Sequence, residues 1–123
     1  MNILSQTVPI QFDTVFSPYA AADWRAAFED VALLGLTGVE LAVAYPERVD
    51  AALVRSAAQN YGLAITTLST GQIYGLAGLY LTAPDAQARA KAAGILRGHI
   101  DLSAKLGLPH VTVGLVRGKL EPG

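Results

Sequence analysis

Five polar side chains that could take part in chemistry follow short apolar runs of the chain. Glu40 lies in the run GVELAV, Thr70, Gln72 and Tyr74 follow the run LAITTLS, and Arg117 follows the run HVTVG. A carboxylate can bind a hydroxyl group or move a proton, and hydroxyl and amide groups can hydrogen-bond to a ligand. A guanidinium can hold an oxyanion through two parallel hydrogen bonds. These five residues are therefore the candidates for binding a small polar substrate.

Each candidate also has an ordinary structural explanation. Glu40 could pair with a base such as Arg48, and Arg117 could be a solvated side chain. The stretch STGQIYGLAGLYLT, residues 69–82, could be a simple connection between a strand and a helix. It is, however, long against the roughly two to six residues that are usual for such a connection. Its length favours a segment that lines a site.

Several other kinds of site have no support in the sequence. The chain has no cysteine, which excludes disulfides, thiolate chemistry and cysteine zinc sites. The glycine-rich stretch matches neither phosphate-binding motif, G-x-x-x-x-G-K-[ST] or G-x-G-x-x-G. His99 and His110 have no carboxylate partner at the spacing of metal ligands, so no metal site is expected from this chain alone. No serine lies in a G-x-S-x-G setting.

Composition indicates a soluble globular protein that forms one domain over residues 1–123. Hydrophobic residues make up 52% and charged residues 15% of the 123 positions, which is too apolar for a disordered chain. No apolar run approaches the ~20 residues of a membrane span, and no signal peptide precedes the first strand, so we expect a cytoplasmic protein without a membrane partner. The net charge of −1 and the absence of a basic cluster predict that nucleic acid is not a partner.

The chain repeats one pattern three times. An alanine- and leucine-bearing segment ends in Gly-Leu and continues into a strand-like run, in ALLGLTGVELAV, AQNYGLAITTLS and SAKLGLPHVTVG. Glycine directly after a helix commonly adopts the left-handed conformation that ends the helix. Each repeat is therefore expected to be a helix, a cap and a strand.

Spacing of apolar residues locates the elements. Strands, apolar on both faces, are predicted at Val8–Phe12, Gly38–Val43, Ala64–Leu68 and His110–Gly114. Helices are predicted at residues 24–34, 49–61 and 83–106. The apolar positions expected to face the core are Trp24, Ala27, Phe28, Val31 and Leu34 in the first helix, Leu53, Ala57 and Tyr61 in the second, and Ala93, Leu96, Ile100 and Ala104 in the third.

Strands that alternate with helices predict parallel β/α units, because such strands are joined by helices that cover the sheet. The predicted order is four strands with three intervening helices. A TIM barrel contains eight such units in about 250 residues, so this chain supplies about half a barrel. The fold class is therefore α/β, with the parallel units of half a TIM barrel.

The same segments carry a family resemblance. LLGLTGVELAV, LSTGQIYGLAGLYLT and HIDLSAKLGLPHVTVGLVRG, in this order and spacing, resemble the sugar phosphate isomerase/epimerase family of xylose isomerase-like TIM barrels, over its N-terminal half. In the first, Gly35, Gly38, Val39, Glu40 and Leu41 match the family pattern G-x-x-G-V-E-L.

The resemblance implies a metal-dependent isomerase or epimerase. Family members bind a divalent cation, Mn²⁺, Mg²⁺ or Zn²⁺, on ligands from later strands that this chain does not contain, and move a proton between neighbouring sugar carbons. The partner is accordingly a sugar or a sugar phosphate. Glu40, Thr70, Gln72, Tyr74 and Arg117 are expected to shape and anchor it, in a fragment that is inactive alone.

Two other functions remain open from the sequence. A truncated half-barrel without catalytic activity could associate with itself, because its outer strands would leave unpaired edges, and a homo-oligomer is expected for this reason. An endonuclease of the same barrel superfamily is a further alternative, which the near-neutral charge disfavours.

Overall fold

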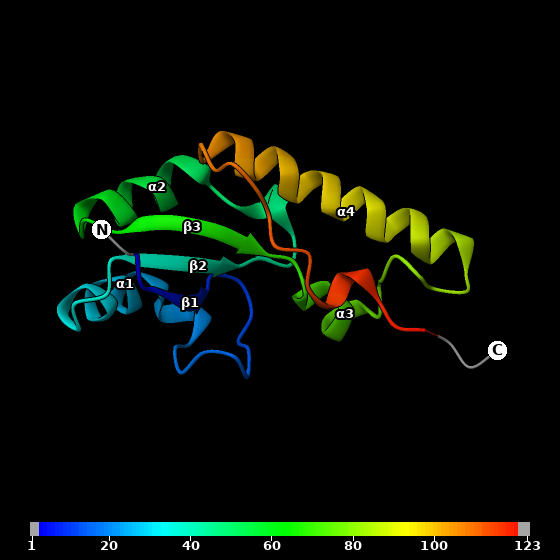
Figure 1. Ribbon diagram of the computed structural model, residues 1–123, viewed down its shortest axis with the longest axis horizontal. Coiled ribbons are helices and arrows are strands. Elements are labelled where there is room, and N and C mark those ends of the chain that lie inside the picture. Colours follow the sequence, from blue (N-terminus) through cyan, green and yellow to red (C-terminus); the bar gives the residue numbers. More distant parts are fainter. Residues whose placement is uncertain (1–2, 121–123) are drawn as a thin grey trace.

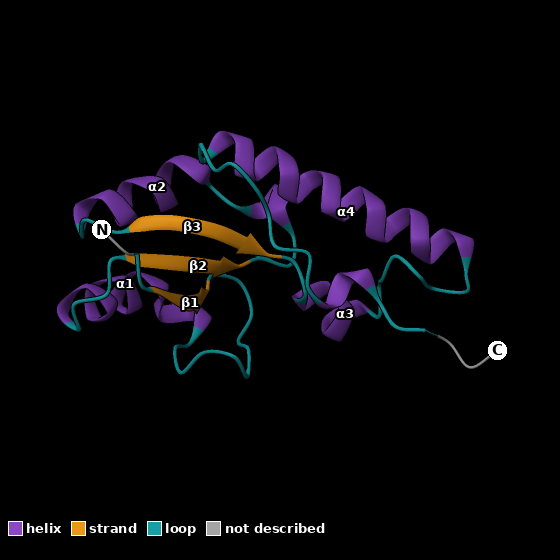
Figure 2. Cartoon of the chain, in the orientation of Figure 1, coloured by secondary structure: helices purple, strands orange, loops and turns teal. Residues whose placement is uncertain are grey.

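The protein is an α/β structure built on one parallel sheet. The computed structural model describes residues 3–120. Strands β1 (Ser5–Pro9), β2 (Gly38–Ala42) and β3 (Ala64–Ser69) lie in the order β1-β2-β3, and the arrowheads of all three point toward α3 (Figures 1 and 2). The predicted α/β class with parallel units is confirmed.

Helices connect the strands and follow them. The helices are α1 (Trp24–Leu33), α2 (Ala51–Asn60), α3 (Gln72–Ala77) and α4 (Ala86–Lys105), with 3₁₀ turns η1 (Ala21–Asp23), η2 (Pro46–Arg48) and η3 (Leu115–Arg117). Helix α4 runs beside β3 and extends beyond the ends of the strands, where α3 and η3 also lie (Figure 1). The carboxyl ends of the strands are therefore surrounded by short elements and loops.

Local sequence explains where the main helices begin and end. Asp50 caps α2, since its carboxylate accepts a hydrogen bond from the Leu53 amide, and Asp85 caps α4 in the same way. The Gly-Leu repeats are confirmed as helix ends: Gly35, Gly62 and Gly107 have φ values of 85°, 66° and 73°. Only glycine adopts this conformation without a steric penalty from Cβ.

One apolar core joins the sheet to α1, α2 and α4. The strands contribute Val8, Val39, Leu41 and Leu68, and the helices contribute buried residues including Phe28. The predicted face of α1 is correct for Ala27, Phe28 and Val31, which are all buried.

Five other predicted core positions are wrong, since Leu34, Leu53, Tyr61, Ile100 and Ala104 are exposed. Leu34 and Tyr61 lie directly after the last residues of α1 and α2, and α2 buries Val54 and Ala58 beside Ala57 rather than Leu53. Helix α4 instead buries Ala92, His99, Leu102 and Ser103. The buried His99 ring lies between two carbonyl oxygens, with Nε2 2.6 Å from Val43 O and Nδ1 2.9 Å from Ile95 O. A neutral imidazole donates to one of them, and the tautomer decides which.

Three element predictions also need correction. The first strand spans Ser5–Pro9 rather than Val8–Phe12, because Ser5 to Pro9 pair with Gly38 to Ala42. The predicted fourth strand, His110–Gly114, makes only an isolated bridge between Thr112 and Ser69, since no described strand lies on its other side. The stretch of residues 69–82 is not a plain loop but contains α3.

The sheet is apolar on one face only, which differs from the prediction. On the face opposite the helices, Thr7 is the register partner of Glu40, which in turn is opposite Thr67. A register irregularity at Glu40 accommodates Thr66, whose hydroxyl hydrogen-bonds with Ser5 at 2.9 Å. This row of polar side chains forms the second face.

No helix within residues 3–120 is long and apolar enough to cross a bilayer.

Candidate functional site

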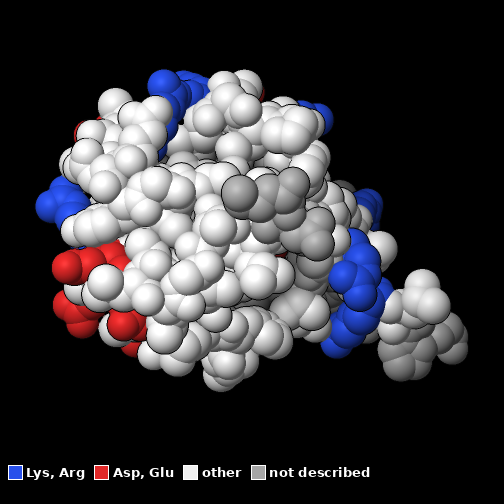
Figure 3. Space-filling view, turned by 60° about the vertical axis from the view of Figure 1, so that its left-hand side comes forward, with Lys and Arg blue, Asp and Glu red and all other residues white. Residues whose placement is uncertain are grey.

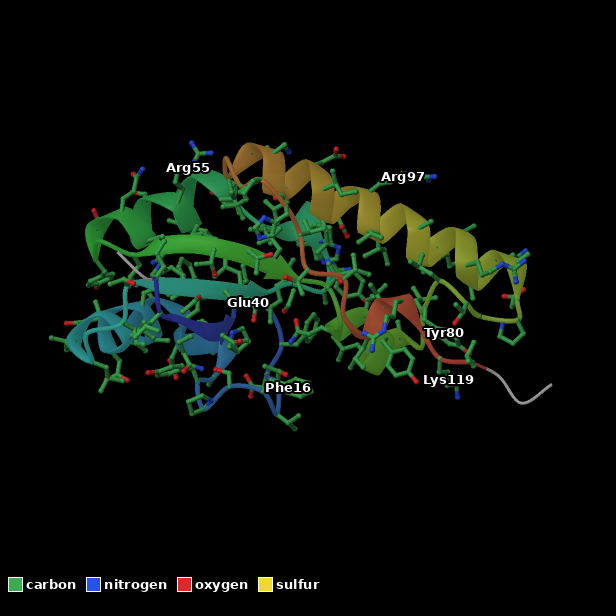
Figure 4. All side chains as sticks on the ribbon, in the orientation of Figure 1. Phe16, Glu40, Arg55, Tyr80, Arg97 and Lys119 are labelled. Atoms are coloured by element: carbon green, nitrogen blue, oxygen red, sulfur yellow. The ribbon has the colours of Figure 1, made fainter. Side chains whose placement is uncertain are left out.

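A cavity of about 400 Å³ opens at the carboxyl ends of the strands. Thr7, Glu40 and Ser69 contribute its floor, while the first loop (residues 10–20), α3 and the segment up to η3 form its walls. In α/β barrels, the carboxyl ends of the strands are where substrates bind. Figure 4 shows Glu40 beside these ends, with Phe16 on the neighbouring first loop.

Glu40 is half-buried and oriented by its neighbour on β1. The Thr7 hydroxyl donates a hydrogen bond of 2.8 Å to Glu40 Oε2. Pairing with Arg48, the structural alternative, does not occur: the Arg48 guanidinium stacks over Tyr45 at 4.2 Å and approaches only Glu47. The Glu40 carboxylate therefore remains available on the cavity side, with one oxygen held by Thr7.

Gln72 also lines the cavity, but its amide group is partly committed. Its Nε2 donates to the carbonyl oxygen of Phe12 at 2.6 Å, which joins α3 to the first loop. Its Oε1 is buried, and no donor among the described residues reaches it. Gln72 therefore connects two walls of the cavity.

The other three candidates do not line the cavity. Thr70 is fully buried, and its hydroxyl donates to Thr112 O at 2.9 Å, which holds the segment after α4 against β3. The Tyr74 ring packs edge-on against Tyr80, with centroids 5.5 Å apart. The exposed Arg117 donates to Gly114 O at 2.9 Å. The structure brings together only Glu40 and Gln72 of the five.

The sequence reasoning missed the first loop as a wall of the site. Asp13, Thr14, Val15 and Phe16 all line the cavity. Asp13 also accepts a hydrogen bond of 2.8 Å from the Ala21 amide, which holds the loop in shape. Their position directly after the first strand was the available signal, but a strand predicted to reach Phe12 concealed how much of this segment is loop.

The cavity carries negative and no positive side chains. Asp13 and Glu40 line it, and none of its described lining residues is Lys, Arg or His. Arg55 and Arg97 point outward from α2 and α4 (Figure 4). On the face shown in Figure 3, Asp and Glu gather at the left, Lys and Arg lie at the edges, and the described residues between them are almost all uncharged. Such a cavity suits a neutral ligand with hydroxyl groups.

The divalent metal implied by the resemblance does not fit the described residues. Within residues 3–120, no group of three or more His, Cys, Asp or Glu side chains lies close enough together to hold a metal ion. Asp13 and Glu40 supply two carboxylates to the cavity, and Asp13 is engaged by the Ala21 amide.

Comparisons with known proteins give structural neighbours only. No protein-family model matches the sequence, and no curated protein matches it. A D-allulose 3-epimerase from Methylomonas sp. in complex with D-allulose superposes with a TM-score of 0.62 and 24% identity, over 85% of this chain and 34% of that chain. A form of that enzyme with additional C-terminal residues superposes with a TM-score of 0.57 and 30% identity, over 73% of this chain and 31% of that chain. A D-psicose 3-epimerase in the presence of D-fructose superposes with a TM-score of 0.59 and 19% identity, over 85% of this chain and 35% of that chain.

This chain therefore spans about one third of the length of these solved epimerases. Its described part contains three parallel strands, which is fewer than the four predicted. The strands and connecting helices superpose on the barrel units of the neighbours, so the predicted fold resemblance is confirmed. The chain has the fold of the xylose isomerase-like TIM barrels, over a part of the barrel.

Proposed function

We propose that this chain forms part of the sugar site of an isomerase or epimerase and that its ligand is an uncharged ketose. One observation carries the proposal: the cavity at the carboxyl ends of the strands has two carboxylates and no cationic side chain among its described lining residues. The structural neighbours named for D-allulose, D-psicose and D-fructose support the same class of ligand.

Glu40 is the residue that we assign to substrate binding. Thr7 holds Oε2, so the carboxylate has a fixed orientation and can accept a hydrogen bond from a sugar hydroxyl through its other oxygen. A hydrogen bond to a charged acceptor contributes about 1.5–3 kcal/mol. Isomerisation or epimerisation itself requires removal of a proton beside the sugar carbonyl, formation of an enediolate and return of the proton. No residue of this chain is assigned to those steps.

The family resemblance leads us to expect a metal, but the described residues do not provide its ligands. The described side chains offer no group of ligands for an ion, so no step of this proposal runs through a metal. Binding and orientation of the sugar are the tasks that the chain's own residues can perform.

The charge of the cavity favours a free sugar over a sugar phosphate. Arg117, the candidate for binding a phosphate, bonds to its own Gly114 carbonyl and does not line the cavity. A phosphate group close to Asp13 and Glu40 would meet repulsion without a compensating cation. The same argument disfavours a nucleic-acid substrate, and with it the endonuclease alternative.

Isothermal titration calorimetry of the chain with D-allulose, and with a hexulose phosphate of equal length, tests the proposal. We expect saturable binding of the free sugar and weaker binding of the phosphate. Glu40→Gln should weaken the sugar affinity about tenfold, by the loss of a charged acceptor. The matched control is Glu47→Gln on exposed η2, which should leave affinity unchanged. Absence of sugar binding, or preference for the phosphate, would contradict the proposal.

Self-association is a second candidate function, favoured by the uncovered polar face of the sheet. The apolar core that α1, α2 and α4 share with the sheet lies on its other face, and the segment around Thr112 has one neighbouring strand among the described residues. Two copies could cover this face for each other. Light scattering would measure a dimer mass if this is correct, and a strict monomer at all concentrations would argue against it.

A further inference from the structure

The first loop, residues 10–20, is attached to the rest of the molecule at separate points. Gln11 fixes its beginning, because its side chain bonds to Ala44 N, Tyr45 N and Tyr45 O at 2.7–2.9 Å. Near its end, the Ser17 hydroxyl donates to Thr7 O at 2.6 Å. Between these points, the bond from Gln72 Nε2 to Phe12 O is the attachment to α3.

The chemistry of this bond fixes the orientation of the Gln72 amide. A carbonyl oxygen can only accept, so the NH₂ group must face Phe12 and Oε1 must face the other way. There Oε1 is buried without a donor in the described part of the chain. An unsatisfied buried acceptor is unfavourable, and it offsets much of what the hydrogen bond contributes. The attachment is therefore specific in geometry but small in net strength.

The part of the loop that this bond controls lines the cavity. Val15 and Phe16 follow Phe12 closely, line the cavity, and are 93% and 71% exposed, so little packing holds them. The Phe12 ring also packs edge-on against Tyr45, and Asp13 is bonded to the Ala21 amide, so release of the Phe12 carbonyl would free only the exposed segment between them, which contains Val15 and Phe16.

We infer that Gln72 is a positioning residue, which acts as a latch between α3 and the first loop and so sets the shape of the cavity wall. Gln72 thus influences the ligand through Phe12 and the loop rather than by its own contact. The latch itself follows from the described contacts alone, whereas its effect on a ketose rests on the proposed function.

Amide hydrogen exchange of Gln72→Glu tests the latch. A glutamate has the same shape, but when ionised it offers no donor to the Phe12 carbonyl. The amides of Phe16, Tyr19 and Ala21 report on the loop, because each donates to a side-chain oxygen within it. We expect their protection factors to fall about two- to fivefold, with one full hydrogen bond as the upper bound, while amides of β2 stay unchanged.

A pH profile separates the latch from a general structural role. Below about pH 4 the introduced carboxyl becomes protonated and regains a donor, so protection of the loop should return in Gln72→Glu. Asp13 and Glu40 line the same cavity, so each pH is compared with Gln72→Met, which keeps both carboxylates. Gln72→Met, which has no donor at any pH, should keep the loop open throughout, and it serves as the test if the first variant does not fold. Gln59→Glu, at an exposed position of α2, is the matched control and should behave like the unmodified chain.

Unchanged loop protection in Gln72→Met, or equal loss of protection in β2, would overturn the inference. Ketose affinity, measured on the same variants, distinguishes this inference from the proposed function. If the loop opens and the unmodified chain binds no ketose, the latch stands and the proposed function fails. If the chain binds ketose and Gln72→Met neither opens the loop nor weakens binding, the latch fails and the proposed function stands.

Discussion

The two faces of the sheet are made by the same three strands but have opposite character. On the helix side, Val8, Leu41 and Leu68 are fully buried in the core. On the cavity side, Thr7 and Glu40 are half-buried and hydrogen-bonded to each other. Successive side chains of a strand point to opposite faces, so a single run such as GVELA supplies both.

The helix side of the sheet therefore contributes mainly to the stability of the fold, and the cavity side contributes mainly to ligand binding. Burial of apolar surface on the helix side contributes roughly 25 cal/mol per Å² to folding. The cavity side buries less apolar surface but presents hydroxyl and carboxylate groups to a ligand. Substitutions on the helix side should therefore change folding, and those on the cavity side should change binding.

The largest expected effect contrasts two phenylalanines. Phe28 on α1 is fully buried and packs edge-on against Trp24, whereas Phe16 at the cavity is largely exposed. Phe28→Ala should lower the free energy of unfolding by about 3–5 kcal/mol, and Phe16→Ala should change it by less than about 0.5 kcal/mol. Urea denaturation measures both. An equal loss of unfolding free energy in the two variants would contradict the view that the helix side stabilises the fold and the cavity side does not.

A smaller effect should distinguish two glycines within α4. A Cβ at Gly98 would lie 2.7 Å from Cγ of the buried Pro46, whereas a Cβ at Gly94 meets nothing within 4 Å. Gly94→Ala should stabilise the protein by about 0.5–1 kcal/mol, since alanine favours a helix. Gly98→Ala adds an overpacking cost of about 1–3 kcal/mol to the same gain. Thermal unfolding that ranks Gly98→Ala as the more stable variant would contradict the described packing of α4 on η2.

The smallest effect concerns a polar contact outside both faces. The Tyr19 hydroxyl donates to Asp30 Oδ2 at 2.5 Å, and this bond, with burial and the charge of Asp30, raises the pKa of Tyr19 above its usual 10.0. The neutral phenol is thus favoured in the folded state, so its stabilisation is present below pH 10 and lost as pH rises through the raised pKa.

The Tm difference between the unmodified chain and Tyr19→Phe measures this contribution. The difference should be small and constant from pH 6 to about pH 9, and it should shrink above about pH 10. A difference that grows with alkaline pH would have the wrong sign for a hydrogen bond donated by the neutral phenol.

Local patterns predicted those parts of the fold that local chemistry determines. Gly35, Gly62 and Gly107 end helices as expected, because positive φ at a helix end strongly selects glycine. The strand at Gly38–Ala42 was predicted within one residue, since an apolar run follows a glycine cap there, although its two faces were expected to be equally apolar.

Elements that depend on distant neighbours were not predictable in the same way. Ser5 and Gln6 have little strand character, and they form β1 because β2 lies beside them. The segment His110–Gly114 contains β-branched residues that favour a strand, but it has only one neighbouring strand among the described residues and forms an isolated bridge. In α4, apolar spacing favoured Ile100, which is 52% exposed, while the hydrogen bonds of His99 placed a polar side chain inside.

The site was predictable to the extent that it follows the ends of strands. Glu40 and Gln72 were selected by that rule and both line the cavity. Thr70 and Arg117 follow it too, but their side chains bond to nearby backbone carbonyl groups instead, and this depends on loop conformations that the sequence pattern does not determine.

Methyl NMR of the chain during titration with D-allulose tests the central claim most directly. Thr7, Thr112 and Leu115 line the cavity and carry methyl groups, whereas Val31 of α1 and Val54 of α2 lie in the core. We expect saturable shifts of the cavity methyl resonances with one common dissociation constant, and unchanged core methyl resonances. Shifts that are absent, that do not saturate, or that are equally large in the core would contradict a sugar site on the polar face of this sheet.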